Sequence, residues 1–76
     1  PITFPKRFTE TKRRILKELA EKDAPMSMRE LSKRTGLSLP TLSRNLREMM
    51  QDNLIKLKKE GRRILAEITK EGKILT

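Results

Sequence analysis

The sequence predicts an α+β fold in which three short helices precede a two-stranded β-hairpin. Three observations indicate this fold. An apolar stripe of helical period follows the N-terminal prolines, two helix-capping serines then flank a glycine, and beyond residue 53 apolar residues alternate with polar ones. With 76 residues and neither a repeat nor a low-complexity linker, the chain is expected to form one domain with a thin core, residues 1–76.

The first eight residues contain two prolines among apolar residues, which predicts an extended N-terminal arm over residues 1–8. Thr9 can cap a helix that runs from Glu10 to about Asp23, and the proline at position 25 ends it. The apolar stripe of this helix consists of Ile15, Leu16, Leu19 and Ala20. Acidic residues accompany its basic ones, so we interpret the latter as a solvated face: Lys12, Arg13, Arg14 and Lys17.

The clearest local signal is a capping box, with Ser27 as N-cap and Glu30 three residues later. It predicts a helix over residues 28–35. Gly36 stands where a left-handed C-cap is needed, and Ser38 then supplies a second N-cap. The segment 27–52 is therefore expected to form a helix, a tight turn and another helix.

The third helix is expected over residues 39–52. Pro40 is tolerated in its first turn, where a backbone N–H has no helical partner to lose. The buried stripe of this helix consists of Leu42, Leu46 and Met49. We interpret Met49 and Met50 as core residues without a cofactor role, and Asn53 as the cap that follows the helix.

Two alternating runs predict a β-hairpin over residues 54–69. The first run begins at Ile55, the second ends at Ile68, and Gly61 between them suits a tight turn. Thr69 can cap a short terminal helix that contains Gly72.

The composition favours a polyanionic partner. Nineteen Lys and Arg residues against ten Asp and Glu residues give a net charge of +9, which favours nucleic acid ahead of an anionic membrane. The chain has no Cys and no His, which excludes disulfides, zinc–thiolate sites and the usual general base. We therefore expect no enzymatic activity, no cofactor and no metal site. No run is long and apolar enough for a membrane span, so a cytoplasmic protein is expected.

The face of the third helix opposite its apolar stripe carries side chains that suit contacts with bases and phosphates. Arginine matches the two acceptors of guanine, glutamine can pair with adenine, and a helix N-terminus favours a phosphate. The predicted DNA-contacting residues here are Ser38, Leu39, Pro40, Thr41, Ser43, Arg44, Arg47 and Gln51. The alternative is a solvated face, with Arg47 and Gln51 interacting across one turn. Glu48 argues against DNA contact, because it borders this face and repels phosphate unless it is turned aside.

The tip of the hairpin is the most basic part of its segment. The segment from Leu54 to Arg63 inclusive holds five basic residues and one acidic residue. The predicted phosphate or minor-groove contacts are Lys58, Lys59, Arg62 and Arg63. The alternative is an edge strand that lysines protect from aggregation. The second helix carries three basic residues, of which one or two are expected to touch the DNA backbone: Arg29, Lys33 and Arg34.

Three segments together resemble a known family: MSMRELSKRTGLSLPTLSRNLREM, NLIKLKKEGRRILAEIT and the Thr-x-x-Gly of residues 69–72. In this order they are similar to the winged helix-turn-helix domains of bacterial and archaeal transcription regulators of the MarR and ArsR type, over roughly residues 9–72. The resemblance implies that the third helix enters the major groove and that the hairpin, the wing, contacts an adjacent groove or the backbone.

The expected function is sequence-specific binding of double-stranded DNA by a transcription regulator. The alternative is an interaction or nucleic-acid module of a larger protein, acting in replication, segregation, RNA binding or protein binding. A homodimer is expected to form through the N-terminal arm or the C-terminal tail. Two other arrangements stay open: the arm covers its own core, or the chain is one domain of a longer protein whose dimerisation part lies elsewhere.

Overall fold

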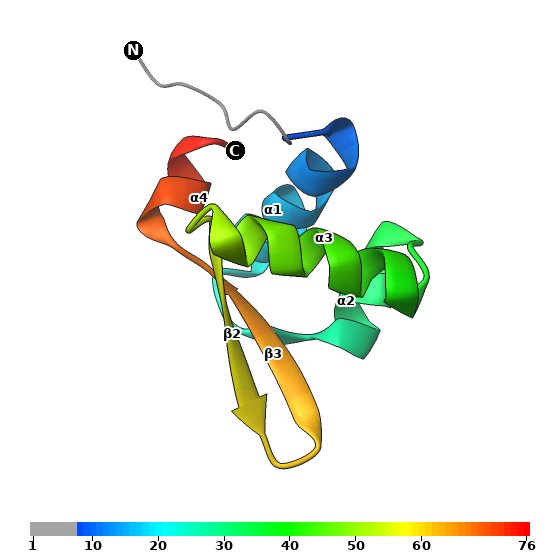
Figure 1. Cartoon of the computed structure of the whole chain (residues 1–76). Helices are drawn as coiled ribbons and strands as arrows, with labels where there is room; N and C mark the ends of the chain where they lie inside the picture. The colour runs from blue at the N-terminus through cyan, green and yellow to red at the C-terminus, as the bar shows by residue number, and fades with distance from the viewer. Residues whose placement is uncertain (1–7) are drawn as a thin grey trace.

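Three helices pack against one end of an antiparallel sheet, and the hairpin of that sheet extends past them (Figure 1). The computed structural model describes residues 8–76, so the expected N-terminal arm lies outside the described residues except for Phe8. The elements in chain order are α1 (Glu10–Lys22), β1 (Met26–Ser27), α2 (Met28–Thr35), α3 (Leu39–Gln51), β2 (Ile55–Glu60), β3 (Arg63–Ile68) and α4 (Lys70–Ile74). The three expected helices and the hairpin are confirmed.

Local capping explains where α1 and α2 begin and end. The Thr9 hydroxyl accepts a hydrogen bond from the backbone N–H of Lys12 at 3.3 Å, and the Ser27 hydroxyl accepts one from Glu30 at 3.2 Å. Gly36 ends α2 in the left-handed conformation, with φ of 75°. Only half of the expected capping box forms, because the Glu30 carboxylate turns instead to Lys22 and Arg34.

The start of α3 differs in one detail from the expectation. Ser38 occupies the N-cap position, but its side chain makes no capping hydrogen bond. Its hydroxyl donates instead to the Thr41 hydroxyl at 3.0 Å. Pro40 lies in the first turn as expected, and Asn53 follows the helix in the left-handed conformation, with φ of 61°.

The sheet has three strands in the order β1-β3-β2, and all of its pairs are antiparallel. Strand β1 was not expected: its two residues pair with β3, Met26 opposite Ala66. Strands β2 and β3 are joined by a two-residue turn in which Gly61 has φ of 62°. A positive φ at the first turn residue suits a type II′ hairpin turn, which favours glycine at this place.

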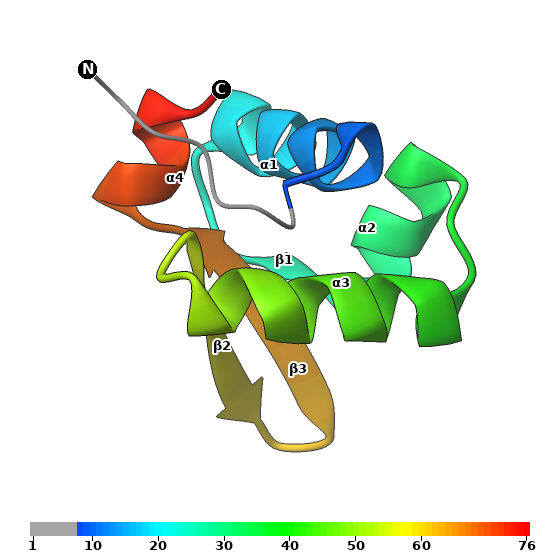
Figure 2. The same cartoon turned by 45° about the horizontal axis from the view of Figure 1, so that its top comes forward.

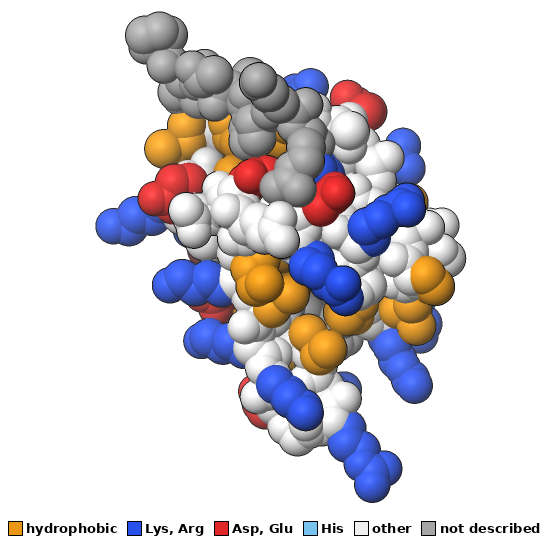
Figure 3. All heavy atoms as spheres, viewed as in Figure 1, with side chains coloured by type: hydrophobic (Ala, Val, Ile, Leu, Met, Phe, Trp, Pro, Cys, Tyr) orange, Lys and Arg blue, Asp and Glu red, His pale blue; other side chains and the backbone are white. Residues whose placement is uncertain are grey.

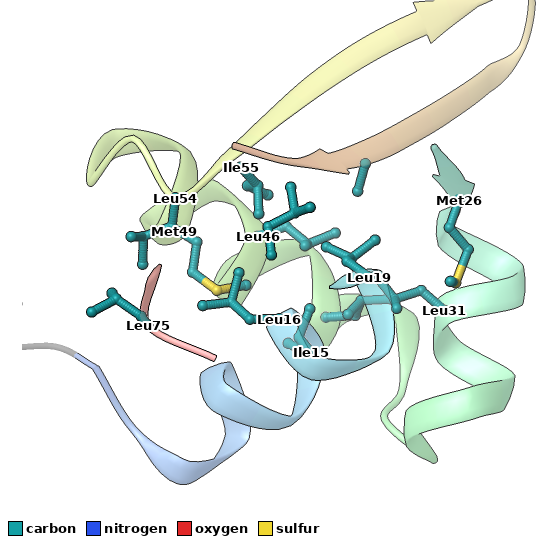
Figure 4. Packing of buried hydrophobic residues seen from close by; sticks show 13 residues of the cluster. Ile15, Leu16, Leu19, Met26, Leu31, Leu46, Met49, Leu54, Ile55 and Leu75 are labelled. Carbon is teal, nitrogen blue, oxygen red and sulfur yellow. The ribbon is translucent and has the colours of Figure 1, made fainter. Parts of the chain in front are cut away.

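The core lies between α1, α2, α3 and the base of the sheet (Figures 2 and 4). Its buried side chains include the whole expected stripe of α3, Leu42, Leu46 and Met49. Met50 was expected in this core, which is wrong, because it is 40% exposed. A helix turns by about 100° per residue, so Met50 cannot share the buried position of Met49.

The expected terminal helix α4 is confirmed, and a hydrogen-bonded junction joins it to the end of α3. The Thr69 backbone N–H donates to the carbonyl of Leu54 at 3.0 Å, and the Thr69 hydroxyl donates to the carbonyl of Asn53 at 2.6 Å. The same hydroxyl accepts from the Gly72 N–H at 3.1 Å. Gly72 is buried against Leu54 and Ile68. The Thr-x-x-Gly motif thus fixes α4 beside the base of the wing.

Candidate nucleic-acid interface

The outward face of α3 carries the side chains that the sequence predicts for DNA contact. Pro40, Arg44, Arg47 and Gln51 are exposed along this face, and Ser43 is half-buried on its flank. At the head of the helix, Ser38 and Leu39 are exposed and Thr41 is half-buried. The buried stripe lies on the other side of the helix, since Leu42, Leu46 and Met49 attach it to the core. All eight residues are therefore exposed or half-buried at the head of α3 or along its outward side.

The two arginines at the centre of this face keep their charge available. Within residues 8–76, neither Arg44 nor Arg47 forms an ion pair. A guanidinium without a carboxylate partner can present its planar donors to the acceptors of guanine or of a phosphate. The acidic residue of this helix pairs instead with a lysine of α1.

That acidic residue is Glu48, and its partner corrects one expectation. Lys12 was expected on a solvated face, but its Nζ lies 2.8 Å from Oε1 of Glu48 and its side chain is only 3% exposed. The physical reason is its position: Lys12, Leu16 and Leu19 occupy places i, i+4 and i+7 of α1, so all three lie on the buried side. Glu48 is thereby turned aside towards α1.

The register of the wing separates its basic residues by face. Residues directly opposite each other in an antiparallel pair share a face, and neighbours along a strand alternate. Leu57 pairs with the buried Ala66, so the next pair on the same face is Lys59 with Ile64. Lys58 pairs with Leu65 and lies on the opposite face. Only Lys59 of these two lysines shares the face of the sheet that covers the core.

The tip of the wing holds the two arginines of the predicted set. Arg62 belongs to the turn, and Arg63 lies opposite Glu60 in the last pair of the ladder. Both are exposed. They carry positive charge to the end of the hairpin that projects furthest from the core (Figure 1).

A groove of about 660 Å³ connects the head of α3 with the wing. Its apolar part includes Leu39 and Ile64, which are 44% and 43% exposed. Its charged rim consists of Arg29, Arg62 and Arg63. Figure 3 shows apolar side chains among Lys and Arg on this side of the molecule. The groove therefore lies between the two predicted contact regions and carries both apolar and basic residues.

Sequence reasoning did not include Ile64 in the site. Its alternating position indicates a strand, but its exposure arises because the wing extends past the core, which is a tertiary feature. Arg29 was expected near the DNA backbone, and it does border the groove. Arg34 is differently placed, because it pairs with Glu30 at 3.2 Å and with Glu18 at 3.7 Å.

An ion cluster holds α1 and α2 together behind this surface. Glu30 accepts hydrogen bonds from Lys22 and Arg34, and the bond from Lys22 lowers the pKa of the Glu30 carboxyl below its ordinary value. The cluster is exposed, so its contribution to stability is small. Arg34 is engaged in this cluster, whereas Arg29 lines the groove. Arg29 is therefore the arginine of α2 that is better placed for the expected contact with the DNA backbone.

Across residues 8–76 there is no group of three acidic residues that could hold a metal ion. In the same part of the chain, no helix is long and apolar enough to cross a bilayer.

The arrangement matches a known family of DNA-binding domains. The family profile for winged helix-turn-helix DNA-binding domains matches residues 8–56, which is more than half of the chain. The chain belongs to this winged helix-turn-helix family. Among curated proteins, no sequence matches it significantly.

Solved structures of transcription regulators share the winged helix-turn-helix fold. The PcaV regulator of Streptomyces coelicolor superposes with a TM-score of 0.85 at 22% identity, covering 92% of this chain and 51% of its own. A MarR variant from E. coli, solved with operator DNA, superposes with a TM-score of 0.82 at 18% identity, covering 91% of this chain and 51% of its own. A homodimeric domain from Mycobacterium bovis, a possible ArsR-family regulator, superposes with a TM-score of 0.78 at 23% identity, covering 88% of this chain and 62% of its own. The chain thus spans about half the length of the first two regulators.

Proposed function

We propose that this winged helix-turn-helix chain binds double-stranded DNA with sequence preference, as the DNA-binding part of a transcription regulator. The observation that carries the proposal is the pair of arginines on the outward face of α3, Arg44 and Arg47, which form no ion pair within residues 8–76. They lie on the helix whose other side is fixed to the core, so the protein can present them rigidly to a groove.

The residues of the surface have distinct roles in this proposal. Arg44 and Arg47 read guanine through paired donors, and Gln51 pairs with adenine. Ser38 and Thr41, at the N-terminus of α3, bind a phosphate with the help of the helix dipole. Ser43 adds a hydroxyl to the same face, and the apolar Leu39 and Pro40 suit contact with thymine methyl groups. The wing contacts comprise Lys58, Lys59, Arg62 and Arg63, which bind phosphates or enter the minor groove.

Salt dependence tests the function directly. Fluorescence anisotropy of a labelled mixed-sequence duplex, titrated with the 76-residue chain at several salt concentrations, measures the affinity. We expect binding at low salt and a linear fall of log K with log salt, with a slope of about −0.9 for each phosphate contact. Single-stranded DNA and an RNA duplex of the same sequence serve as controls. Absence of duplex binding at low salt, or stronger binding of either control, contradicts the proposal.

The faces of the wing give a matched pair of variants. Lys59→Ala is expected to weaken binding to all duplexes by a similar factor, because a phosphate contact carries no sequence information. The loss should be about 5- to 10-fold near 0.1 M salt, and the salt slope should fall by about 0.9. Lys58→Ala removes the same charge from the opposite face of the hairpin, and we expect a smaller loss. Anisotropy titrations of the two variants decide between the faces, and a larger loss for Lys58→Ala would mean that the DNA lies against the other side of the wing.

We further propose that the chain acts as a homodimer, through the N-terminal arm or the C-terminal tail. Ile74 is exposed beside the end of the chain, and a shallow hollow lined by Phe8, Ile74 and Leu75 lies between the start of α1 and the last residues of the chain. An exposed apolar residue in such a hollow suits contact with a second copy. Light scattering at two concentrations measures the state, and a monomer at both contradicts this part of the proposal.

A further inference from the structure

An ion pair with a buried lysine connects α1 to the predicted reading helix. Nζ of Lys12 lies 2.8 Å from Oε1 of Glu48, and the two side chains are 3% and 35% exposed. Lys12 is the one buried basic residue among residues 8–76. A buried lysine is rare unless an acidic partner compensates its charge, so this contact requires an explanation.

Stability alone explains the pair poorly. Taking the ammonium of Lys12 out of water is unfavourable, and apolar residues of similar volume often stabilise a protein as well as a buried ion pair does. The position of Lys12 follows the same apolar stripe as Leu16 and Leu19, where a methionine would fit. The charge of Lys12 is therefore better explained by what it does to Glu48.

Glu48 occupies a sensitive place on α3. It follows Arg47 directly and lies one turn after Arg44, at the border of the outward face. A carboxylate that is released at this border would repel phosphates. It could also pair with Arg44, since residues four apart on a helix are neighbours. Either event would subtract positive charge from the surface that is proposed to bind DNA.

We propose that Lys12 is a positioning residue for nucleic-acid binding: from α1 it holds the Glu48 carboxylate away from the outward face of α3 and so keeps the charge of Arg44 available. This inference rests on the proposed function. Lys12 itself is buried and contacts no DNA. Its effect on binding passes through Glu48.

Three variants of the 76-residue chain separate this role from a structural one: Lys12→Met, Glu48→Gln and the double variant. Lys12→Met fills the buried stripe without a charge, so its midpoint of chemical denaturation should stay close to that of the wild type. Glu48→Gln leaves the buried ammonium without that carboxylate, so its midpoint should fall. Far-UV circular dichroism measures both effects.

The affinities should follow a different order from the stabilities. With a mixed-sequence duplex near 0.1 M salt, Lys12→Met should bind roughly 5- to 10-fold more weakly and lose about 0.9 from the salt slope, equivalent to one phosphate contact. Glu48→Gln should bind at least as tightly as the wild type, although it is less stable. The double variant should regain wild-type affinity within about twofold, because the carboxylate is gone.

Two results would overturn the inference. If Lys12→Met binds as tightly as the wild type, Lys12 has no role in positioning Glu48. If the double variant binds as weakly as Lys12→Met, or if Glu48→Gln loses affinity, the residues act through packing. The wild-type titration keeps the proposed function separate: failure of the wild type to bind duplex refutes that function, whereas normal wild-type binding with unaffected variants refutes only the inference.

Discussion

Gly72→Ala is expected to lower the free energy of unfolding by about 3 kcal/mol, at the upper end of what overpacking usually does. A Cβ atom on Gly72 would lie 2.3 Å from the carbonyl oxygen of Leu54 and 2.8 Å from Cγ1 of Ile68. The carbonyl is backbone and already accepts the hydrogen bond from Thr69, so it cannot move aside without breaking the junction of α4. For a domain of this size, the loss corresponds to a fall of roughly 10–25 °C in the melting temperature.

The measurement is chemical denaturation followed by far-UV circular dichroism, because the chain has no Trp or Tyr for fluorescence. Gly36→Ala is the matched control. Gly36 has φ of 75° and open space around it, so its substitution should cost only about 1–2 kcal/mol of backbone strain. Asparagine at position 36 should recover part of that loss, whereas asparagine at position 72 should be worse than alanine. Equal losses for the two alanine variants would refute the steric explanation of Gly72.

The elements that the sequence predicts best depend on local chemistry. Ser27 and Gly36 mark the two ends of α2 through hydrogen bonds to residues only a few positions away. The sequence pattern alone is therefore enough to predict where α2 begins and ends. The same holds for Thr69, whose cap fixes the start of α4. Local chemistry is not sufficient at Ser38, because its hydroxyl stands at the N-cap position but forms its hydrogen bond with the Thr41 hydroxyl.

Features that depend on distant partners could not be predicted. Strand β1 has two residues, too few for a periodic signal, and it exists only because β3 supplies its hydrogen bonds. The burial of Lys12 had a local signal in its spacing from Leu16 and Leu19, but its partner Glu48 lies on another helix. The charge of lysine suggested a solvated face, and the tertiary contact reversed that interpretation.

The wing has one feature that the sequence predicts and another that depends on tertiary packing. Alternation along β2 already implies that Lys58 and Lys59 lie on opposite faces. Which of these faces continues the surface of α3 depends on how the hairpin packs on the core, and the burial of Ala66 decides it. The groove beside Leu39 and Ile64 likewise joins segments that are distant in the sequence.

Arg44→Ala and Arg47→Ala are each expected to reduce affinity for the preferred DNA sequence by about 1–3 kcal/mol, or roughly 5- to 150-fold. The reason is that each arginine offers a planar pair of donors from a rigid helix face, and neither forms an ion pair within residues 8–76. On mixed-sequence DNA the loss of affinity should be smaller, because there the substitution removes only the attraction between the arginine charge and the phosphates. The preferred sequence is first obtained by selecting from a random duplex library with the wild-type chain, and anisotropy then measures each variant on both DNAs.

Two further variants separate the geometry of the guanidinium from its charge. Arg44→Lys keeps the charge but loses the planar fork, so it should restore binding to mixed DNA while the preference for the selected sequence stays reduced. Arg14→Ala removes an equal charge from α1, on the exposed side opposite to its buried stripe, and should change affinity on both DNAs by a small and similar factor. If Arg44→Ala and Arg47→Ala instead lose the same factor on selected and mixed DNA, these arginines bind phosphates, and the sequence preference must come from other side chains of α3 or from the wing.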